Sequence, residues 1–120
     1  MEHVPVVITG MGVLACNGLG RTAFWDAIRA GQSGIRRLDR FDASELPCQI
    51  AGQLWDFNPE DFMRKSMVKH WHRHVHQAVA CAKLAVEDAG LASAGYDPER
   101  MATAVGTSVG SPHEAWESQH

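Results

Sequence analysis

The longest periodic segment of the chain, Met67–Leu91, has the hydrophobic pattern of one amphipathic helix. Apolar residues recur there at steps of three and four positions while charged residues fall elsewhere, so one side of the predicted helix is continuously apolar. Most residues on that side are small, which would let another helix or a sheet approach closely. Gly90 follows the periodic residues and predicts the end of the helix. The apolar positions are Val68, Trp71, Val75, Ala78, Ala82, Ala85 and Ala89.

Two short apolar runs flank this segment and predict buried β-strands. Val4–Thr9 is an almost unbroken β-branched run, which is typical of a strand covered on both faces. Met101–Val105 is apolar enough to lie beside it. The order strand, helix, strand predicts parallel pairing with a right-handed crossover and therefore an α/β fold. The small-residue loop at residues 106–110 would lie at the sheet edge where α/β proteins bind ligands.

The segment between the first run and the long helix predicts shorter elements. Thr22 can cap a helix that continues through Ile28 and ends at Gly31. Residues 35–57 have an irregular pattern, with a weak strand at residues 50–54. This part of the chain is therefore expected to be a surface excursion.

Three capping patterns predict further helix starts. Asn58 followed by Pro59 begins a short helix that continues to about Lys65. Residues 97–99 predict a helical turn, and residues 111–114 form a capping box with proline at the first helical position. Because two strands are too few for a covered α/β sheet, we expect the chain to be the amino-terminal part of something longer.

The composition is that of an ordinary globular protein and excludes several classes. The 120 residues are 45% hydrophobic and 21% charged, with a formal net charge of −3. No basic surface is indicated for nucleic acid, and no apolar run approaches the roughly 20 residues of a membrane span. The first residues have no signal-peptide pattern. We therefore expect a cytoplasmic protein that binds neither nucleic acid nor membrane. Three widely spaced cysteines, Cys16, Cys48 and Cys81, indicate reduced thiols.

A glycine motif raises a nucleotide-binding interpretation that its context opposes. Residues 10–15 match the G-x-G-x-x-A dinucleotide fingerprint. That fingerprint needs a helix opening at its glycines and a second buried strand ending in an acid about 20 residues on. Residues 16–20 are still loop, and residues 35–39 are too polar for a central strand. We therefore expect no nucleotide cofactor.

Several ordered patches of the sequence resemble one family, the β-ketoacyl-acyl carrier protein synthases, and together they cover essentially the whole chain. The resemblance implies a thiolase-like layered fold, of which this chain would supply the amino-terminal part, and a homodimer or a heterodimer with a related subunit. It also implies decarboxylative condensation of an acyl thioester with malonyl-carrier protein in fatty-acid or polyketide synthesis. The patches are residues 6–12 with Gly18, Trp25 with residues 30–35, residues 41–42 through 51–52 to 56–57, residues 85–91 and residues 104–110.

The resemblance places the family's catalytic residues outside this chain. Its nucleophilic cysteine lies in a small-residue motif beyond the point where this sequence ends, and its histidines lie further on. Cys16 and Cys81 match no such motif and are expected to be packing thiols. The one residue carried over is Val109, which by resemblance gates the acyl pocket; the alternative is a core valine at a strand end. The isolated segment should be inactive.

Four alternating histidines stand at the start of the predicted long helix. On one helix, His70 would pair with His74 and His72 with His76, and each pair could hold a metal ion. No acidic or cysteine third ligand is near in the sequence, and imidazoles on a wet helix face are common. We therefore expect no metal site.

Two other functions remain open at this stage. One is a non-catalytic partner of the chain-length-factor kind, which would keep the fold without the nucleophile. The other is a stand-alone binding or assembly module that uses the half-fold. Such a module would have to hide its apolar sheet edge by self-association.

Overall fold

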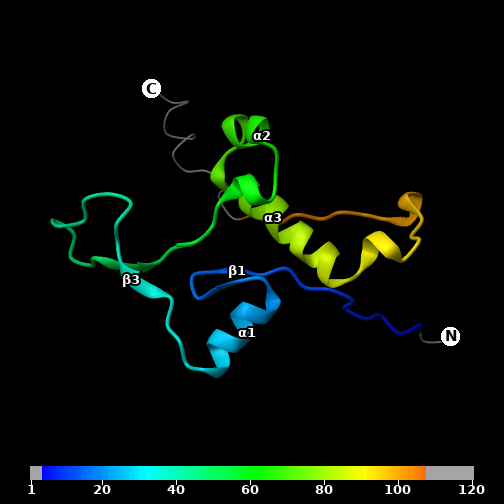
Figure 1. Cartoon of the computed structure of the whole chain (residues 1–120), viewed down its shortest axis with the longest axis horizontal. Helices are drawn as coiled ribbons and strands as arrows, with labels where there is room; N and C mark the ends of the chain where they lie inside the picture. Colours follow the sequence, from blue (N-terminus) through cyan, green and yellow to red (C-terminus); the bar gives the residue numbers. More distant parts are fainter. Residues whose placement is uncertain (1–3, 108–120) are drawn as a thin grey trace.

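The computed structural model describes residues 4–107, which form three α-helices, two small antiparallel sheets and three 3-10 turns (Figure 1). The helices are α1 (Arg21–Arg29), α2 (Lys65–His70) and α3 (Arg73–Asp88). One sheet pairs β1 (Leu14–Ala15) with β2 (Gly18–Leu19), and the other pairs β3 (Ile35–Arg37) with β4 (Ile50–Gly52). The 3-10 turns are η1 (Pro59–Asp61), η2 (Leu91–Ser93) and η3 (Pro98–Arg100).

The β1–β2 hairpin leads directly into α1 and sets its starting point. Gly20 precedes the helix with φ 83°, a left-handed conformation that glycine adopts readily, and its N–H donates to the Val13 carbonyl at 2.8 Å. The helix therefore begins at Arg21, and Thr22 lies inside its first turn. The prediction of a Thr22 cap is wrong, because the turn from β2 already fixes the start of the helix. The predicted end is confirmed, since Gly31 follows α1 with φ 65°.

The excursion between residues 35 and 57 is built on the second hairpin. β3 and β4 pair antiparallel with Ile35 opposite Gly52 and Arg37 opposite Ile50. The weak strand predicted around residue 50 is thus confirmed at its first three residues. Gln49 continues the hairpin beyond the last pair, because its carbonyl accepts from the Leu38 N–H at 2.8 Å.

The predicted long helix is two helices, α2 and α3, separated by an extended break. Trp71 and His72 have ψ values of 151° and 158°, which end one helix and precede the next. Histidine, tryptophan and valine are only moderate helix formers, so local propensity does not resist this break. η1 packs against both α2 and α3, and tertiary contact therefore decides the local conformation. The far end is as predicted, because α3 stops at Asp88 and Gly90 follows with φ 61°.

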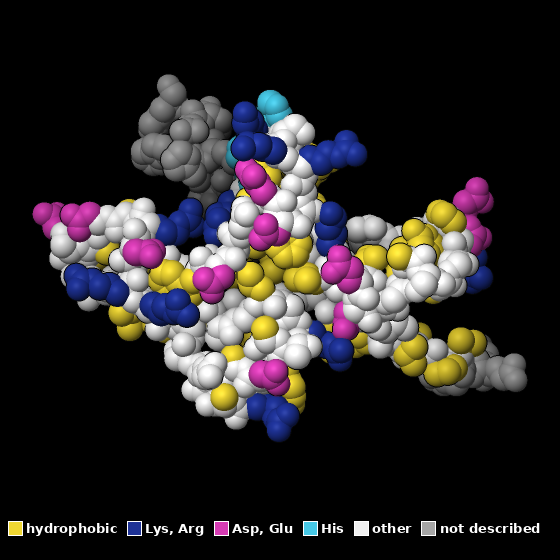
Figure 2. All heavy atoms as spheres, viewed as in Figure 1, with side chains coloured by type: hydrophobic (Ala, Val, Ile, Leu, Met, Phe, Trp, Pro, Cys, Tyr) yellow, Lys and Arg dark blue, Asp and Glu magenta, His cyan; other side chains and the backbone are white. Residues whose placement is uncertain are grey.

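The two predicted buried strands do not form among the described residues. Val4–Thr9 and Met101–Val105 run without ladder partners, and neither sheet contains a parallel pair. Val6 is 97% exposed and Val105 75%, and Figure 2 shows hydrophobic side chains on the surface of the amino-terminal segment. A strand needs a neighbouring strand to pair its backbone groups and cover its faces. Residues 4–107 supply none here, so the βαβ order predicted from the sequence is not confirmed within them.

Buried contacts are local, and no single large core unites the described residues. The buried hydrophobic side chains are Ala27, Ala43, Phe57, Met63 and Ala80. The radius of gyration is 17.9 Å, larger than the roughly 14 Å of a compact domain of this length. The arrangement is therefore a set of segments supported chiefly by α3, which crosses the centre of the molecule (Figure 1).

Two predicted caps are confirmed and begin 3-10 turns, but the helix expected to continue to about Lys65 already ends at Asp61. The Asn58 side chain accepts from the Glu60 N–H at 3.2 Å before η1, and the Asp97 side chain accepts from the Glu99 N–H at 3.0 Å before η3. The helix predicted from residue 111 lies outside the described residues. None of the helices between residues 4 and 107 has the length and apolar composition that crossing a bilayer requires.

Candidate functional site

The segment after Val4–Thr9 lies directly on α3 because it carries glycines at alternate positions. A Cβ built on Gly12 would collide with the carbonyl oxygen of Cys81, and one built on Gly10 would lie 2.6 Å from the Ala89 nitrogen. The Cys81 thiol donates to the Gly12 carbonyl at 2.9 Å. The G-x-G pattern therefore serves close packing of backbone on helix, and Cys81 joins the two elements.

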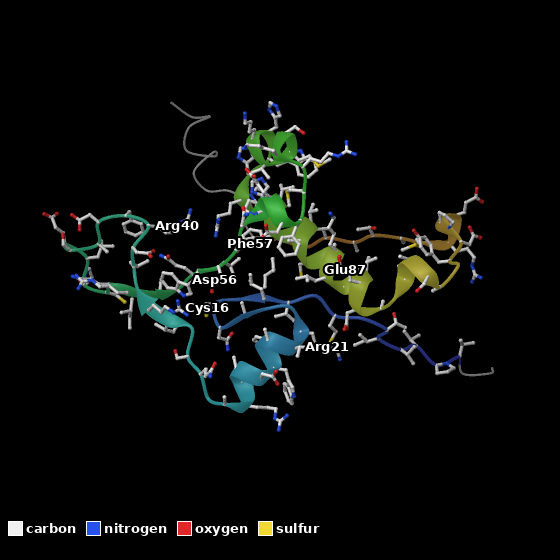
Figure 3. All side chains as sticks on the ribbon, viewed as in Figure 1. Cys16, Arg21, Arg40, Asp56, Phe57 and Glu87 are labelled. Atoms are coloured by element: carbon white, nitrogen blue, oxygen red, sulfur yellow. The ribbon has the colours of Figure 1, made fainter. Side chains whose placement is uncertain are left out.

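Asp88, the last residue of α3, connects three parts of the chain. Its carboxylate accepts from the Met11 N–H at 3.0 Å and pairs with the Arg21 Nε at 2.9 Å. Figure 3 shows Arg21 at the start of α1, beside the amino-terminal segment that crosses α3. Sequence reasoning did not single out Asp88. Its position just before the glycine that ends the helix was the available signal.

Cys16 lies at the β1–β2 turn and lines a polar pocket of about 130 Å³. A Cβ built on Gly52 would lie 2.9 Å from its sulfur, so β4 packs closely on the turn. The Trp55 indole N–H donates to the Gly34 carbonyl at 2.9 Å and fixes one wall. The remaining pocket residues are Ala15, Asn17, Gly18, Leu19, Gln32, Ser33, Arg36 and Asp56.

The three thiols contact backbone or packed turns in the part of the chain that the structure describes. No histidine lines the pocket around Cys16, and an activated thiol needs an adjacent base or a lowered pKa. Cys81 donates to a backbone carbonyl, and exposed Cys48 donates to the Ile50 carbonyl at 3.4 Å. This geometry agrees with packing thiols at Cys16 and Cys81.

The helix break separates one of the two histidine pairs that the sequence predicted, His70 with His74. His70 ends α2, His72 precedes α3, and His74 and His76 lie within α3. The rings of His72 and His74 are parallel, with centroids 6.1 Å apart. His76 is only 7% exposed, and its Nε2 has no hydrogen-bond partner. The predicted pairing of His70 with His74 on one helix is thus wrong. His72 and His76 remain one turn apart at the start of α3, because the His76 N–H donates to the His72 carbonyl at 3.1 Å. Among the described residues, no group of three or more histidine, cysteine or acidic side chains could hold a metal ion.

The candidate gate residue, Val109, lies outside the described residues. Thr107, two positions before it, is the last residue described. The role of Val109 in gating the acyl pocket therefore rests only on the sequence resemblance.

An apolar pocket of about 510 Å³ lies between α1 and the segment that precedes β1. Met11 and Val13 line it from that segment, and Phe24 and Trp25 line it from α1. Trp25 is 57% exposed, so this large aromatic surface is uncovered in the described structure.

Comparison with known protein families shows to which family this chain belongs. The sequence model of the β-ketoacyl synthase amino-terminal domain matches residues 3–120. The chain belongs to this family, and the resemblance read from its sequence is confirmed.

Two subunits of one polyketide synthase are among the relatives of this chain. The chain is 41% identical over 106 residues to the tetracenomycin polyketide synthase ketoacyl synthase alpha subunit of Streptomyces glaucescens, covering 88% of this chain and 25% of that protein. It is 34% identical over 97 residues to the beta subunit of the same system, covering 81% and 22% respectively. The chain thus spans about a quarter of the length of the curated relatives it matches.

A solved structure supports the fold class. The ishigamide ketosynthase/chain length factor matches with a TM-score of 0.65 and 36% sequence identity over 70% of this chain and 21% of the other. The matched 70% of this chain therefore shares its arrangement with a ketosynthase-type protein of the thiolase-like class.

Proposed function

We propose that this chain supplies the amino-terminal part of a β-ketoacyl-acyl carrier protein synthase. The observation that carries the proposal is the family match over residues 3–120. Such an enzyme joins an acyl thioester to malonyl-carrier protein, with release of carbon dioxide. The similarity to a polyketide synthase subunit favours polyketide synthesis as the pathway, with fatty-acid synthesis as the related alternative.

The chemistry needs a cysteine thiolate that takes the acyl group from its thioester and releases the carrier thiol. Loss of carbon dioxide from the malonyl group then gives a carbanion that attacks the enzyme-bound acyl group. The thiolate is released as the carbon–carbon bond forms, and oriented hydrogen-bond donors stabilise the negative charge that develops on oxygen. The proposed partners are acyl carrier protein and a second ketosynthase-type subunit.

In this proposal residues 1–120 provide structure and no catalytic group. The arrangement of Cys16, Cys48 and Cys81 supports this division, because each thiol contacts backbone or packed turns. Val109 remains a proposed gate for the acyl pocket.

The alternative function is a non-catalytic partner of the chain-length-factor kind. One observation favours this alternative and another favours the catalytic synthase. The structural neighbour is titled as a ketosynthase/chain length factor. Identity is nevertheless higher with the tetracenomycin alpha subunit, at 41%, than with the beta subunit, at 34%. The catalytic reading is therefore the stronger of the two.

The deciding experiment is the intact mass of the native gene product before and after exposure to an acyl-carrier thioester. We expect a gain of one acyl group, retained in Cys16→Ser and Cys81→Ser variants. A product that stays unmodified would favour the non-catalytic partner. Loss of acylation in the Cys16→Ser variant, with the fold intact, would contradict the structural role of this segment.

A further inference from the structure

A third pocket, of about 230 Å³, lies where the β3–β4 loop approaches the start of α3. Asp39 and Arg40 line it from the loop, and Arg73, the first residue of α3, lines it from the helix. Figure 2 shows Lys and Arg side chains gathered at this junction, and Figure 3 shows Arg40 on the side of its loop that faces Phe57 and α3. The other lining residues are Gln53, Leu54, Trp55 and Phe57.

The two arginines bring positive charge together without a matching ion pair. Within residues 4–107, the ion pairs of 4.0 Å or less are Arg21 with Asp88 and Lys65 with Glu60. Neither involves Arg40 or Arg73. Asp39 is the one acidic residue that lines the pocket, against two guanidinium groups.

Arg73 is partly buried and lies near a second cation, Arg40, and both effects disfavour an uncompensated charge. Its guanidinium carbon also lies 5.5 Å from the centroid of the Phe57 ring, a cation–π contact that favours the cation and holds it at the pocket. Burial, and then the nearby charge of Arg40, lower the pKa of Arg73 from its ordinary value. A bound anion would offset both effects, because it supplies the opposite charge that the pocket lacks.

The remaining surroundings also suit an anion. α3 has no acidic residue in its first turn and no side-chain cap, so the partial positive charge of its amino-terminal end is not neutralised there. Guanidinium groups match the oxygens of phosphate in a bidentate geometry. At about 30 Å³ per water molecule, the volume has room for roughly seven waters, enough for a small tetrahedral oxyanion.

We propose that Arg40 and Arg73 bind a small oxyanion in this pocket, either inorganic phosphate or the phosphate group of a phosphomonoester. Trp55 and Phe57 would form apolar walls, and the Gln53 side chain would offer a further donor. The site does not depend on the condensing activity proposed above, because none of its residues is assigned to that reaction.

The experiment is titration calorimetry of the protein with inorganic phosphate, at constant ionic strength maintained with chloride. Variants Arg40→Gln and Arg73→Gln should each weaken phosphate binding by about tenfold, since each removes one charge-assisted contact. Arg73→Lys should retain part of the affinity. Arg29→Gln is the matched control, because Arg29 lies in the last turn of α1 and lines none of the described pockets.

A second titration, with glycerol phosphate, distinguishes a site for inorganic phosphate from a site for a phosphomonoester. A phosphomonoester site should bind glycerol phosphate at least as tightly as inorganic phosphate. Absence of phosphate binding by the unmodified protein would overturn the proposal. Equal affinity of the Arg40→Gln and Arg29→Gln variants would do the same. If the Arg73→Gln variant fails to fold, the Arg40→Gln variant is sufficient for the test. Arg40 is exposed, and circular dichroism can verify that this variant is folded.

Discussion

Two neighbouring segments near the amino terminus, residues 4–8 and residues 10–12, behave in opposite ways. Both lie in the apolar start of the chain, yet Val6 is 97% exposed and Ile8 83%, whereas Gly10 and Gly12 lie against the backbone of α3. The difference is one of available partners. A glycine can rest on a helix that the chain itself provides, but a β-branched run needs neighbouring strands that residues 4–107 do not provide.

The comparison teaches that hydrophobicity alone does not bury a segment. The packed segment gains a thiol hydrogen bond from Cys81 and a carboxylate contact from Asp88. Residues 4–8 are more apolar, but they pair with no neighbouring strand within residues 4–107. Specific contacts to an existing element therefore decide which part of this region is fixed.

The largest effect is expected for Gly12→Ala, which should destabilise the chain by about 3 kcal/mol. The new methyl group would collide with the Cys81 carbonyl, so the segment would have to lift from α3. Urea unfolding measures the change. Gly106→Ala is the matched control, because nothing lies within 4 Å of its built Cβ. Similar losses in both variants would show that the close approach at Gly12 is unimportant.

Asp88→Ala should cost about 1 kcal/mol, because the exposed Met11 N–H loses its acceptor and Arg21 loses its partner, and water can replace part of both contacts. The Arg21 side chain is 54% exposed, so most of the loss is expected from the Met11 contact and little from the ion pair. The same unfolding assay applies, with Glu87→Ala, one position earlier and exposed, as the control. An unchanged stability of the Asp88→Ala variant would show that the Asp88 contacts do not fix the segment at residues 10–12 on α3.

Val6→Thr should change the free energy of unfolding by less than about 0.5 kcal/mol in a chain of these 120 residues, since the side chain is almost fully exposed. Ala80→Val on α3 provides the contrast, because Ala80 is 0% exposed and the larger side chain should overpack its site. Thermal unfolding of the two variants measures both effects. A loss above 1 kcal/mol in Val6→Thr would mean that the first segment is packed after all.

The smallest effect concerns Asp42, in a loop held by local contacts. Its side chain accepts from the Ser44 N–H at 3.0 Å, and this hydrogen bond lowers the pKa of Asp42 below its ordinary value. Because the folded pKa is lower than the unfolded one, the stabilisation is present above the unfolded pKa and is lost as pH falls through the folded pKa. A carboxyl NMR titration should show the low midpoint, and Asp42→Asn should be less sensitive to acid. A midpoint at the ordinary value would refute the contact.

Local signals in the sequence were sufficient for the ends and caps of several elements. Gly31 and Gly90 follow α1 and α3 as predicted, and Asn58 caps η1 with its side chain. These features depend on a few neighbouring residues, so they can be inferred without knowing the rest of the fold. The family could also be recognised, because its patches occur in order along the chain.

Features that depend on distant residues could not be inferred in the same way. The break at Trp71 and His72 interrupts a continuous helical pattern, and it depends on how η1 packs against α2 and α3. This break also separates His70 from His74, which were expected on one helix. The approach of Arg40 to Arg73 joins residues 33 positions apart and has no local sequence signal.

The sequence by itself determined the family, the ends of α1 and α3, the caps of two 3-10 turns and the glycine pattern that allows close packing. Only the tertiary structure decided that Gly10 and Gly12 rest on α3, that Asp88 joins three segments and that two arginines share one pocket. The reason is that caps and turns are set by interactions within a few residues. Packing, burial and charge proximity depend instead on which distant segments meet, and a linear pattern does not specify that.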